Sequence, residues 1–204
     1  MTPENKKQKR ILHEPDFELV AKIVLVLTLI GIVVSTGLIF SPPIGGEEYA
    51  ELGLLTYNEA SETYEADNYP KNTIYNQTLG YSNNITLYVY VSNHYKEVKF
   101  FEIRLKIGLQ SVIINEDTYG TNTTTYFYTE HWLERILDSG KKWGPSEETK
   151  FEFNFTSEIL TKLGTSSKGY KIIFELWEWS NQQNDFSYTG IHVYLTSFMV
   201  IMVT

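Results

Sequence analysis

The residue types best suited to chemistry in this chain are a carboxylate and two tryptophans in the segment FELWEWSN. In an extended strand, Glu175, Trp177 and Trp179 alternate onto one face. Carbohydrate-active sites use aromatic rings beside a carboxylate to stack a sugar and to transfer protons. Glu178 falls on the opposite face, so it cannot act as the second carboxylate that glycoside hydrolysis needs. We therefore interpret Glu175, Trp177 and Trp179 as an interaction face, formed by an outward-facing part of a sheet.

No other pattern in the sequence indicates an active site. The chain has no cysteine, which excludes disulfides, cysteine-ligated metals and a thiol nucleophile. Its four histidines are far apart and lack the spacing of metal ligands. The sequence also contains neither a nucleophile elbow nor a glycine-rich phosphate loop. We predict a protein that is not an enzyme and that uses no metal or other cofactor.

The strand that carries Glu175 is one of many segments in which apolar and polar residues alternate with period two. Seven or eight short antiparallel strands in about 150 residues favour a two-sheet sandwich of immunoglobulin-like type. Two short helices are predicted, at 130–137 from apolar residues at three- and four-residue spacing and at 157–163, which Gly164 ends. The fold class is mainly β. The predicted strands are 84–92, 101–109, 150–156, 169–179 and 191–203, with weaker ones at 49–55, 73–79 and 123–129.

The same alternation predicts which side chains face the core. In 101–109 the apolar residues from Phe101 to Leu109 should be buried, and Glu102, Arg104 and Lys106 should face solvent. In 150–156 three phenylalanines should point inward and Asn154 outward. The polar segment 92–98 has the length of a hairpin connection between two of these strands.

An uncharged apolar run from Ile23 to Phe40 predicts a membrane segment. At ~1.5 Å per residue its 18 residues span about 27 Å, close to the hydrocarbon thickness of a bilayer. We predict a transmembrane helix at 19–41 and a juxtamembrane joint with two prolines at 42–48. A cleaved signal peptide is the alternative, but the run is long for one and lacks a small-residue cleavage pattern.

The distribution of basic residues predicts the orientation of this helix. Five lysines and arginines precede the apolar core, and the next basic residue after it is Lys71. Because basic residues stay on the cytoplasmic side, residues 1–18 should form a cytoplasmic basic tail and residues 49–204 an extracytoplasmic domain. The predicted location is the cell membrane, with a single pass through the lipid bilayer.

Four glycosylation sequons fall in the predicted external part, and none precedes the helix. We therefore expect N-linked glycans at Asn76, Asn84, Asn122 and Asn154. The formal net charge of −8 disfavours a nucleic-acid partner, which would require a basic face. The expected partners are the bilayer and other membrane or envelope proteins.

Several motifs follow one another along the chain: Pro42 and Pro43, YAELGLL at 49–55, ADNYP at 66–70, ITLYVYVSNHYKEVKFFEIRL at 85–105, KKWGP at 141–145 and GYKIIFELW at 169–177. In this order they resemble an uncharacterised archaeal membrane-protein family with a domain of unknown function. The resemblance extends over residues 42–200 and implies an extracytoplasmic domain next to transmembrane helices. It implies no catalytic residue, and this chain differs from the commoner arrangement by having one helix instead of several.

These observations predict a membrane-anchored, glycosylated interaction or structural module, a subunit or accessory protein of a cell-surface or envelope assembly. Two alternatives stay open. A pilin-like filament subunit would use KKQKR as its leader, although polar residues separate it from the apolar run. A carbohydrate-binding or carbohydrate-active surface protein would use the face of Glu175, Trp177 and Trp179.

Overall fold

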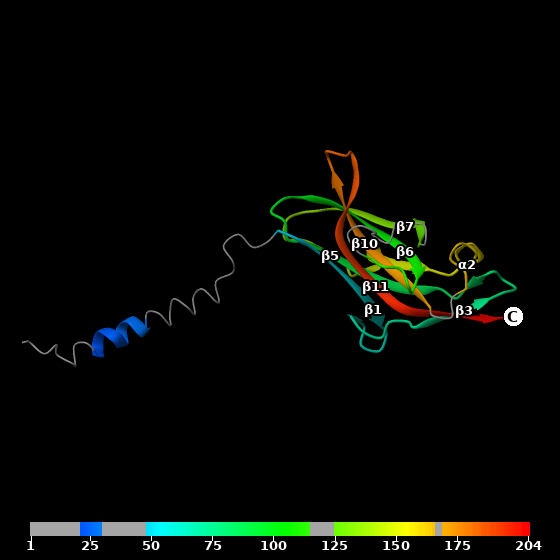
Figure 1. The fold of residues 1–204 in the computed structure, drawn as a ribbon, viewed down its shortest axis with the longest axis horizontal. Helices are drawn as coiled ribbons and strands as arrows, with labels where there is room; N and C mark the ends of the chain where they lie inside the picture. The colour runs from blue at the N-terminus through cyan, green and yellow to red at the C-terminus, as the bar shows by residue number, and fades with distance from the viewer. Residues whose placement is uncertain (1–20, 30–47, 115–124, 166–168) are drawn as a thin grey trace, which may run out of the picture. The chain divides into compact units, whose positions relative to one another are not determined.

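The computed structural model describes residues 21–29, 48–114, 125–165 and 169–204. The chain divides into two compact units, Met1–Gly46 and Glu47–Thr204. Figure 1 shows that the described part of the second unit consists mainly of β-strands. The prediction of a mainly β protein is therefore confirmed.

In the first unit the described residues, 21–29, form a helix. This stretch lies inside the predicted membrane segment 19–41, and its apolar side chains, such as Leu25 and Leu27, are exposed. Among the described helices, none combines the length and apolar character needed to cross a membrane. The predicted tail at 1–18, and all but one residue of the joint at 42–48, lie outside the described residues.

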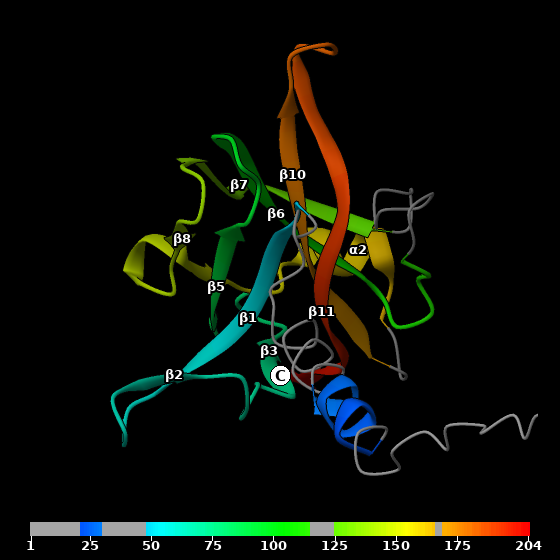
Figure 2. The ribbon, with the colours of Figure 1, turned by 90° about the vertical axis from the view of Figure 1, so that its left-hand side faces the viewer.

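The described residues of the second unit form two β-sheets (Figure 1, Figure 2). The five-stranded sheet has the order β2-β1-β5-β8, with β9 also paired to β5, and the six-stranded sheet has the order β4-β3-β11-β10-β6-β7. The strands are β1 (Ala50–Asn58), β2 (Thr63–Glu65), β3 (Asn72–Asn76), β4 (Tyr81–Ser82), β5 (Ile85–Asn93), β6 (Lys99–Leu109), β7 (Thr125–Leu137), β8 (Lys142–Trp143), β9 (Lys150–Phe153), β10 (Tyr170–Ser180) and β11 (Asp185–Val203).

One strand pair departs from the predicted antiparallel arrangement. Strand β11 has 19 residues, and its last part, from Met199 to Val203, pairs in parallel with β3. The antiparallel pairing of β11 with β10 ends at Phe198, so the end of β11 is free to add β3 to the sheet. The two sheets are thus mostly antiparallel, with one parallel pair made by segments that are distant in sequence.

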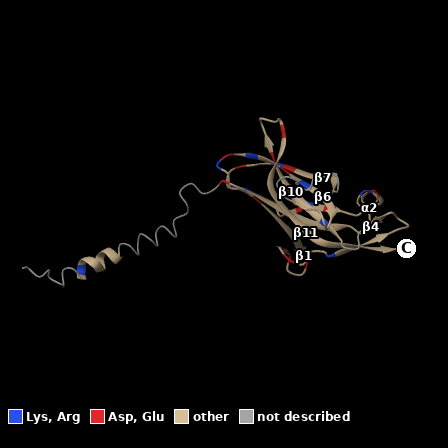
Figure 3. Ribbon diagram, viewed as in Figure 1, with Lys and Arg blue, Asp and Glu red and all other residues tan. Residues whose placement is uncertain are grey.

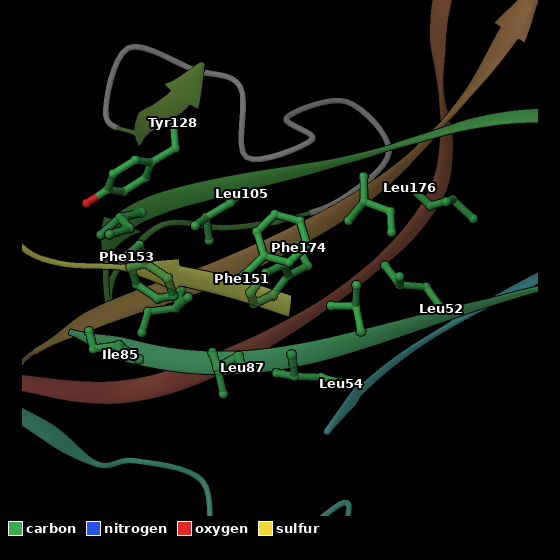
Figure 4. Close-up of a cluster of buried hydrophobic side chains, with 14 of the residues drawn as sticks. Leu52, Leu54, Ile85, Leu87, Leu105, Tyr128, Phe151, Phe153, Phe174 and Leu176 are labelled. Carbon is green, nitrogen blue, oxygen red and sulfur yellow. The ribbon is translucent and has the colours of Figure 1, made fainter. Parts of the chain in front are cut away.

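The core lies between the apolar faces of the two sheets, as Figure 4 shows. Leu54 and Leu87 of the five-stranded sheet lie in one hydrophobic cluster with Leu105, Phe174 and Leu176 of the six-stranded sheet. The predicted inward phenylalanines of 150–156 are all buried, which confirms the alternation there. At about 25 cal/mol per Å² of buried apolar surface, this core is the main source of the stability of the domain.

The segment 92–98 does not form the predicted hairpin, because β5 and β6 belong to different sheets. Each of these strands has one apolar face, and crossing from one sheet to the other lets the two faces meet. Asn93 stabilises the crossing: its buried side chain donates hydrogen bonds to the carbonyls of Glu97 and Leu137 and accepts one from the amide of Tyr95.

The predicted helix at 130–137 is wrong, since this segment is the second half of β7. Ile103 pairs with Leu133, and Phe100 with Ile136, along the neighbouring strand β6. A helix of eight residues is marginal without tertiary support, so pairing with β6 decides the local structure. The described residues of this unit form two short helices: α2 (Ser157–Leu163), which was predicted, and the 3-10 helix η1 (Glu147–Thr149), which was not.

Candidate functional site

The candidate site is the face of the six-stranded sheet that points away from the core. Strand register places the polar residues of β6 and β10 beside a partner on both sides, because directly paired residues share a face. Arg104 on β6 pairs with Glu175 on β10 and Trp132 on β7. We call this the outer face: its residues include Phe100, Glu102, Arg104, Lys106, Phe127, Trp132, Glu134, Ile136, Ile173, Glu175, Trp177, Trp179, Phe186, Tyr188, His192 and Tyr194.

A buried ion pair lies at the centre of the outer face. Lys106 Nζ donates to Glu175 Oε2 at 2.6 Å, and Trp177 Nε1 donates to the same oxygen at 3.0 Å. The Lys106 and Glu175 side chains are only 3% and 0% exposed. Within the described chain, Glu175 Oε1 is buried without a hydrogen-bond partner. The Glu175 carboxylate is therefore shielded from solvent. Its two hydrogen bonds from described residues both reach Oε2, and none reaches Oε1.

Aromatic rings cover the cations of this face. The Arg104 guanidinium carbon lies 3.8 Å from the centroid of the Trp177 ring and 5.6 Å from that of Phe127. Lys106 Nζ lies 5.2 Å from the Trp177 ring, and Phe127 stacks on Trp132 with centroids 5.9 Å apart. Cation–π contacts stabilise charges that have lost their water, so the rings and the ion pair hold each other in place.

Two irregularities in the strands flank the ion pair. Between Phe127 and Trp132, β7 bulges away from β6 opposite Leu105. Between Tyr188 and His192, β11 bulges away from β10, and Gly190 there has a φ of +84°. Bulges redirect side chains and are frequent beside functional sites. Here they lie on both sides of the β6–β10 pair that carries the charges.

Burial dominates the electrostatics of the outer face. Loss of water raises the pKa of the Glu175 carboxyl and lowers the pKa of the Lys106 ammonium, and their mutual attraction opposes both changes. Burial and the neighbouring Glu102 also raise the pKa of Glu134. Arg104 also forms an ion pair with Glu102 of the same strand. Figure 3 shows that both acidic and basic residues occur in the β-sheet unit.

The structure places Glu175, Trp177 and Trp179 on one face, as predicted from the sequence, but their exposure differs from the prediction. Glu175 is fully buried, so only the half-buried Trp177 and Trp179 of the three could contact a partner. The prediction that Glu102 and Lys106 face solvent is wrong, because both are buried by the outer-face aromatics. The interaction role of this face stays a prediction.

Sequence analysis missed Lys106 and Arg104 as members of the site. In the sequence, Glu102, Arg104 and Lys106 alternate with apolar residues. Such alternation normally indicates that the polar side of a strand faces solvent. Only the pairing of β6 with β10 brings this row next to Glu175.

The predicted glycosylation sites differ in their surroundings. Asn84 is exposed, and its Nδ2 donates to Glu152 at 2.7 Å. Asn76 and Asn154 are half-buried, and the Asn76 side chain accepts hydrogen bonds from two amides of the following turn. Asn122 lies outside the described residues. Within the described chain, no group of three or more potential ligands could hold a metal ion.

Comparisons with known proteins give only distant structural likenesses. No family model matches the chain, and no curated protein matches it. A β-glucosidase from Listeria innocua is 13% identical, with a TM-score of 0.30, over 76% of this chain and 17% of its own. A GH3 β-glucosidase from Bifidobacterium adolescentis is 10% identical, with a TM-score of 0.29, over 74% of this chain and 18% of its own.

The sporulation control protein Spo0M from Bacillus subtilis is 15% identical, with a TM-score of 0.29, over 74% of this chain and 49% of its own. The chain thus spans less than a fifth of the two glucosidases and about half of Spo0M. Scores this low support no inference about function.

Proposed function

We propose that residues 49–204 form a non-enzymatic interaction module that binds a membrane or envelope protein through the outer face. The observation that carries this proposal is an aromatic and apolar surface on a fixed sheet. Trp132, Ile136 and Tyr194 are 43%, 65% and 44% exposed on the face that carries the buried Lys106–Glu175 pair. Aromatic residues on a rigid face are typical anchors of protein interfaces.

The geometry of Glu175 favours binding over catalysis. A glycosidase needs two carboxyl groups that reach the substrate, one of them able to donate a proton. The Glu175 carboxylate is inaccessible and held by Lys106 and Trp177. Its role is to hold Trp177 and the neighbouring cations in place, so that the surface is formed before a partner arrives.

The proposal includes the location of the module. We place it outside the cell as an immunoglobulin-like sandwich, anchored by one transmembrane helix at 19–41 with a cytoplasmic N-terminus and carrying N-linked glycans. The basic residues before the apolar run support this orientation, and the exposed side chain of Asn84 supports glycan access. Protease added to intact cells should digest a C-terminal tag and spare an N-terminal one. The reverse pattern would contradict this location.

Site-specific photo-crosslinking tests the interaction. A photoreactive amino acid replaces Trp132 or Tyr194 in the full chain. The variants are expressed in the cells from which the protein comes, and their membranes are irradiated. A control probe replaces Tyr57, which is 42% exposed on the other sheet and so matches the outer-face positions in accessibility. We expect discrete crosslinked products from the outer-face probes and not from the control. Absence of outer-face products, or equal products from all three positions, would contradict the proposal.

A further inference from the structure

An exposed apolar patch lies on the six-stranded sheet where β3, β4 and the last residues of β11 meet (Figure 1). Residues 72–84 and 193–204, which contain these elements, include no Asp, Glu, Lys or Arg, in a chain of which 21% is charged. Contiguous exposed apolar surface marks a site of contact with another group. We call this the terminal patch: its side chains are 37–58% exposed, and they are Ile74, Leu79, Tyr81, Met199, Ile201 and Val203.

Strand register places Asn76 inside the terminal patch. Asn76 is paired with Tyr81 of β4 on one side and with Val203 of β11 on the other, and directly paired residues share a face. Ile74, two residues earlier on β3, lies on the same face and pairs with Ile201. The alternate residues of β3 and of the end of β11 are buried or pack on the core, so this face points outward.

The turn after β3 orients the side-chain amide of Asn76. Its Oδ1 accepts hydrogen bonds from the backbone amides of Thr78 at 2.9 Å and Leu79 at 3.0 Å. Because only the oxygen of a carboxamide can accept from an N–H, these bonds identify Nδ2 as the atom directed away from the turn amides. In Asn84, by contrast, Nδ2 is itself engaged and donates to Glu152 at 2.7 Å.

We propose that an N-linked oligosaccharide on Asn76 covers the terminal patch. The inference rests on the extracellular location in the proposed function, and Asn76 with Thr78 forms the sequon. The donor is a phosphate-linked oligosaccharide. A bond forms between C1 of its first sugar and Nδ2, the bond from C1 to the phosphate oxygen breaks, the phosphate leaves as an anion, and Nδ2 releases one proton.

The dimensions of the sheet place the patch within reach of the first sugars. Neighbouring strands are about 4.8 Å apart and alternate residues of one strand about 6.6 Å apart, so Tyr81, Val203 and Ile74 all lie close to the attachment point. The C–H face of a sugar ring is apolar and packs on aromatic and aliphatic side chains. Its hydroxyl groups then replace exposed apolar surface with polar surface.

A second copy of the chain is the competing occupant of the terminal patch. Such an interface would bury the Asn76 amide among apolar side chains, and Nδ2 would lose its hydrogen bonds to water, which costs free energy. A glycan uses the same amide as its attachment point. The polar group inside the patch therefore favours the glycan.

Substitutions of Thr78 test the proposal on the full chain, expressed in the cells from which the protein comes and then purified. Thr78→Val removes the sequon, and the matched control Thr78→Ser keeps it. Thr78 is exposed, and both variants keep the backbone amide that bonds to Asn76. A second variant, Asn76→Asp, removes the attachment point but keeps an acceptor for the turn amides. Glycopeptide mass spectrometry measures occupancy, and hydroxyl-radical footprinting measures oxidation of Tyr81 and Met199.

We expect a glycan on Asn76 in the wild-type chain and in Thr78→Ser, and none in Thr78→Val. Oxidation of Tyr81 and Met199 should rise several-fold when the glycan is absent, while oxidation of Tyr57 on the other sheet stays unchanged and shows that the variants are folded. An unmodified Asn76 in the wild-type chain, or equal oxidation with and without the glycan, would overturn the inference. Protection of the patch in Thr78→Val that disappears on dilution would assign it to a second copy and would also overturn the inference.

Failure of this inference is distinguishable from failure of the proposed function. Protease digestion of the terminal tags determines the location of the domain without reference to any glycan. Crosslinking at Trp132 and Tyr194 determines whether the outer face binds a partner, and neither residue belongs to the terminal patch. An unmodified Asn76 in a domain shown to be external would therefore overturn this inference alone.

Discussion

Replacing Lys106 with methionine should destabilise the domain by about 3–5 kcal/mol at neutral pH. The substitution leaves the Glu175 carboxylate 0% exposed with a single donor, Trp177 Nε1, and removes the ammonium 2.6 Å from Oε2. Deleting one partner of a buried ion pair typically costs this much, because the remaining charge is uncompensated. Methionine has a similar length to the lysine stem, so cavity formation adds little.

The double variant Lys106→Met with Glu175→Gln separates the charge effect from packing. Glutamine keeps an acceptor for Trp177 Nε1 but needs no counter-ion, so the double variant should recover most of the lost free energy of unfolding. Chemical denaturation of the wild-type, the two single variants and the double variant completes the cycle. The control is Lys96→Met, which removes an exposed ion pair with Glu48 and should cost less than about 1 kcal/mol.

The loss in Lys106→Met should also depend on pH. Burial holds the pKa of Glu175 above its unfolded value, and loss of the ammonium raises it further. A carboxyl with a raised folded-state pKa stabilises the fold below its unfolded pKa and loses that contribution as pH rises through the folded pKa. The variant should therefore approach wild-type stability near pH 4 and fall behind it toward pH 7. A loss below about 0.5 kcal/mol at pH 7, as for a surface lysine, would refute the reasoning.

Three further predictions follow from the core, a surface carboxyl and a helix cap. Leu105→Ala should lower the free energy of unfolding by about 2–5 kcal/mol in a denaturant titration, because the side chain is 0% exposed between the sheets and leaves a cavity. Hydrogen bonds, first from Asn58, lower the pKa of Glu65, so its contribution to stability is present above its unfolded pKa and is lost as pH falls through the folded pKa. In a carboxyl NMR titration Asn58→Ala should shift the Glu65 midpoint upward, and an unchanged midpoint would rule out this cause. Thr156→Ala removes the hydroxyl that caps α2 and should cost about 1 kcal/mol by thermal melting, whereas Thr161→Ser in the same helix should have little effect.

Alternation predicted the strands and their core-facing residues because burial between two sheets imposes period two on the sequence. It predicted Leu105 and Phe174 as core, and both are fully buried. It could not predict the burial of Lys106 and Glu175. That burial depends on the rings of Phe127 and Trp177, which belong to the neighbouring strands β7 and β10 and lie close to the Lys106 ammonium. The alternation of residues within one strand does not show which side chains of another strand will lie beside them in the sheet.

The same limit explains the errors in topology. The apolar spacing in 130–137 fits one helical face as well as it fits a strand, and only the long edge of β6 selects the strand. The segment 92–98 has hairpin length, yet the apolar faces of β5 and β6 have to meet across the core. The parallel pairing of β3 with β11 joins residues more than a hundred positions apart, which no local signal encodes.

The ion pair of Lys99 with Glu178 illustrates a partial success. The sequence placed Glu178 on the face opposite Glu175, and that separation is present. Its partner Lys99 comes from a distant strand, so the ion pair was not visible in the sequence. Residues that act together here are brought together by sheet register, which composition and spacing do not fix.

Hydroxyl-radical footprinting of the full chain in its native membranes and after purification tests the central claim most directly. If the outer face binds a partner, oxidation of Trp132 and Tyr194 should fall several-fold in membranes, while that of the similarly exposed Tyr57 stays unchanged. Equal oxidation of Trp132 and Tyr194 in membranes and in the purified protein would contradict an interaction through this face.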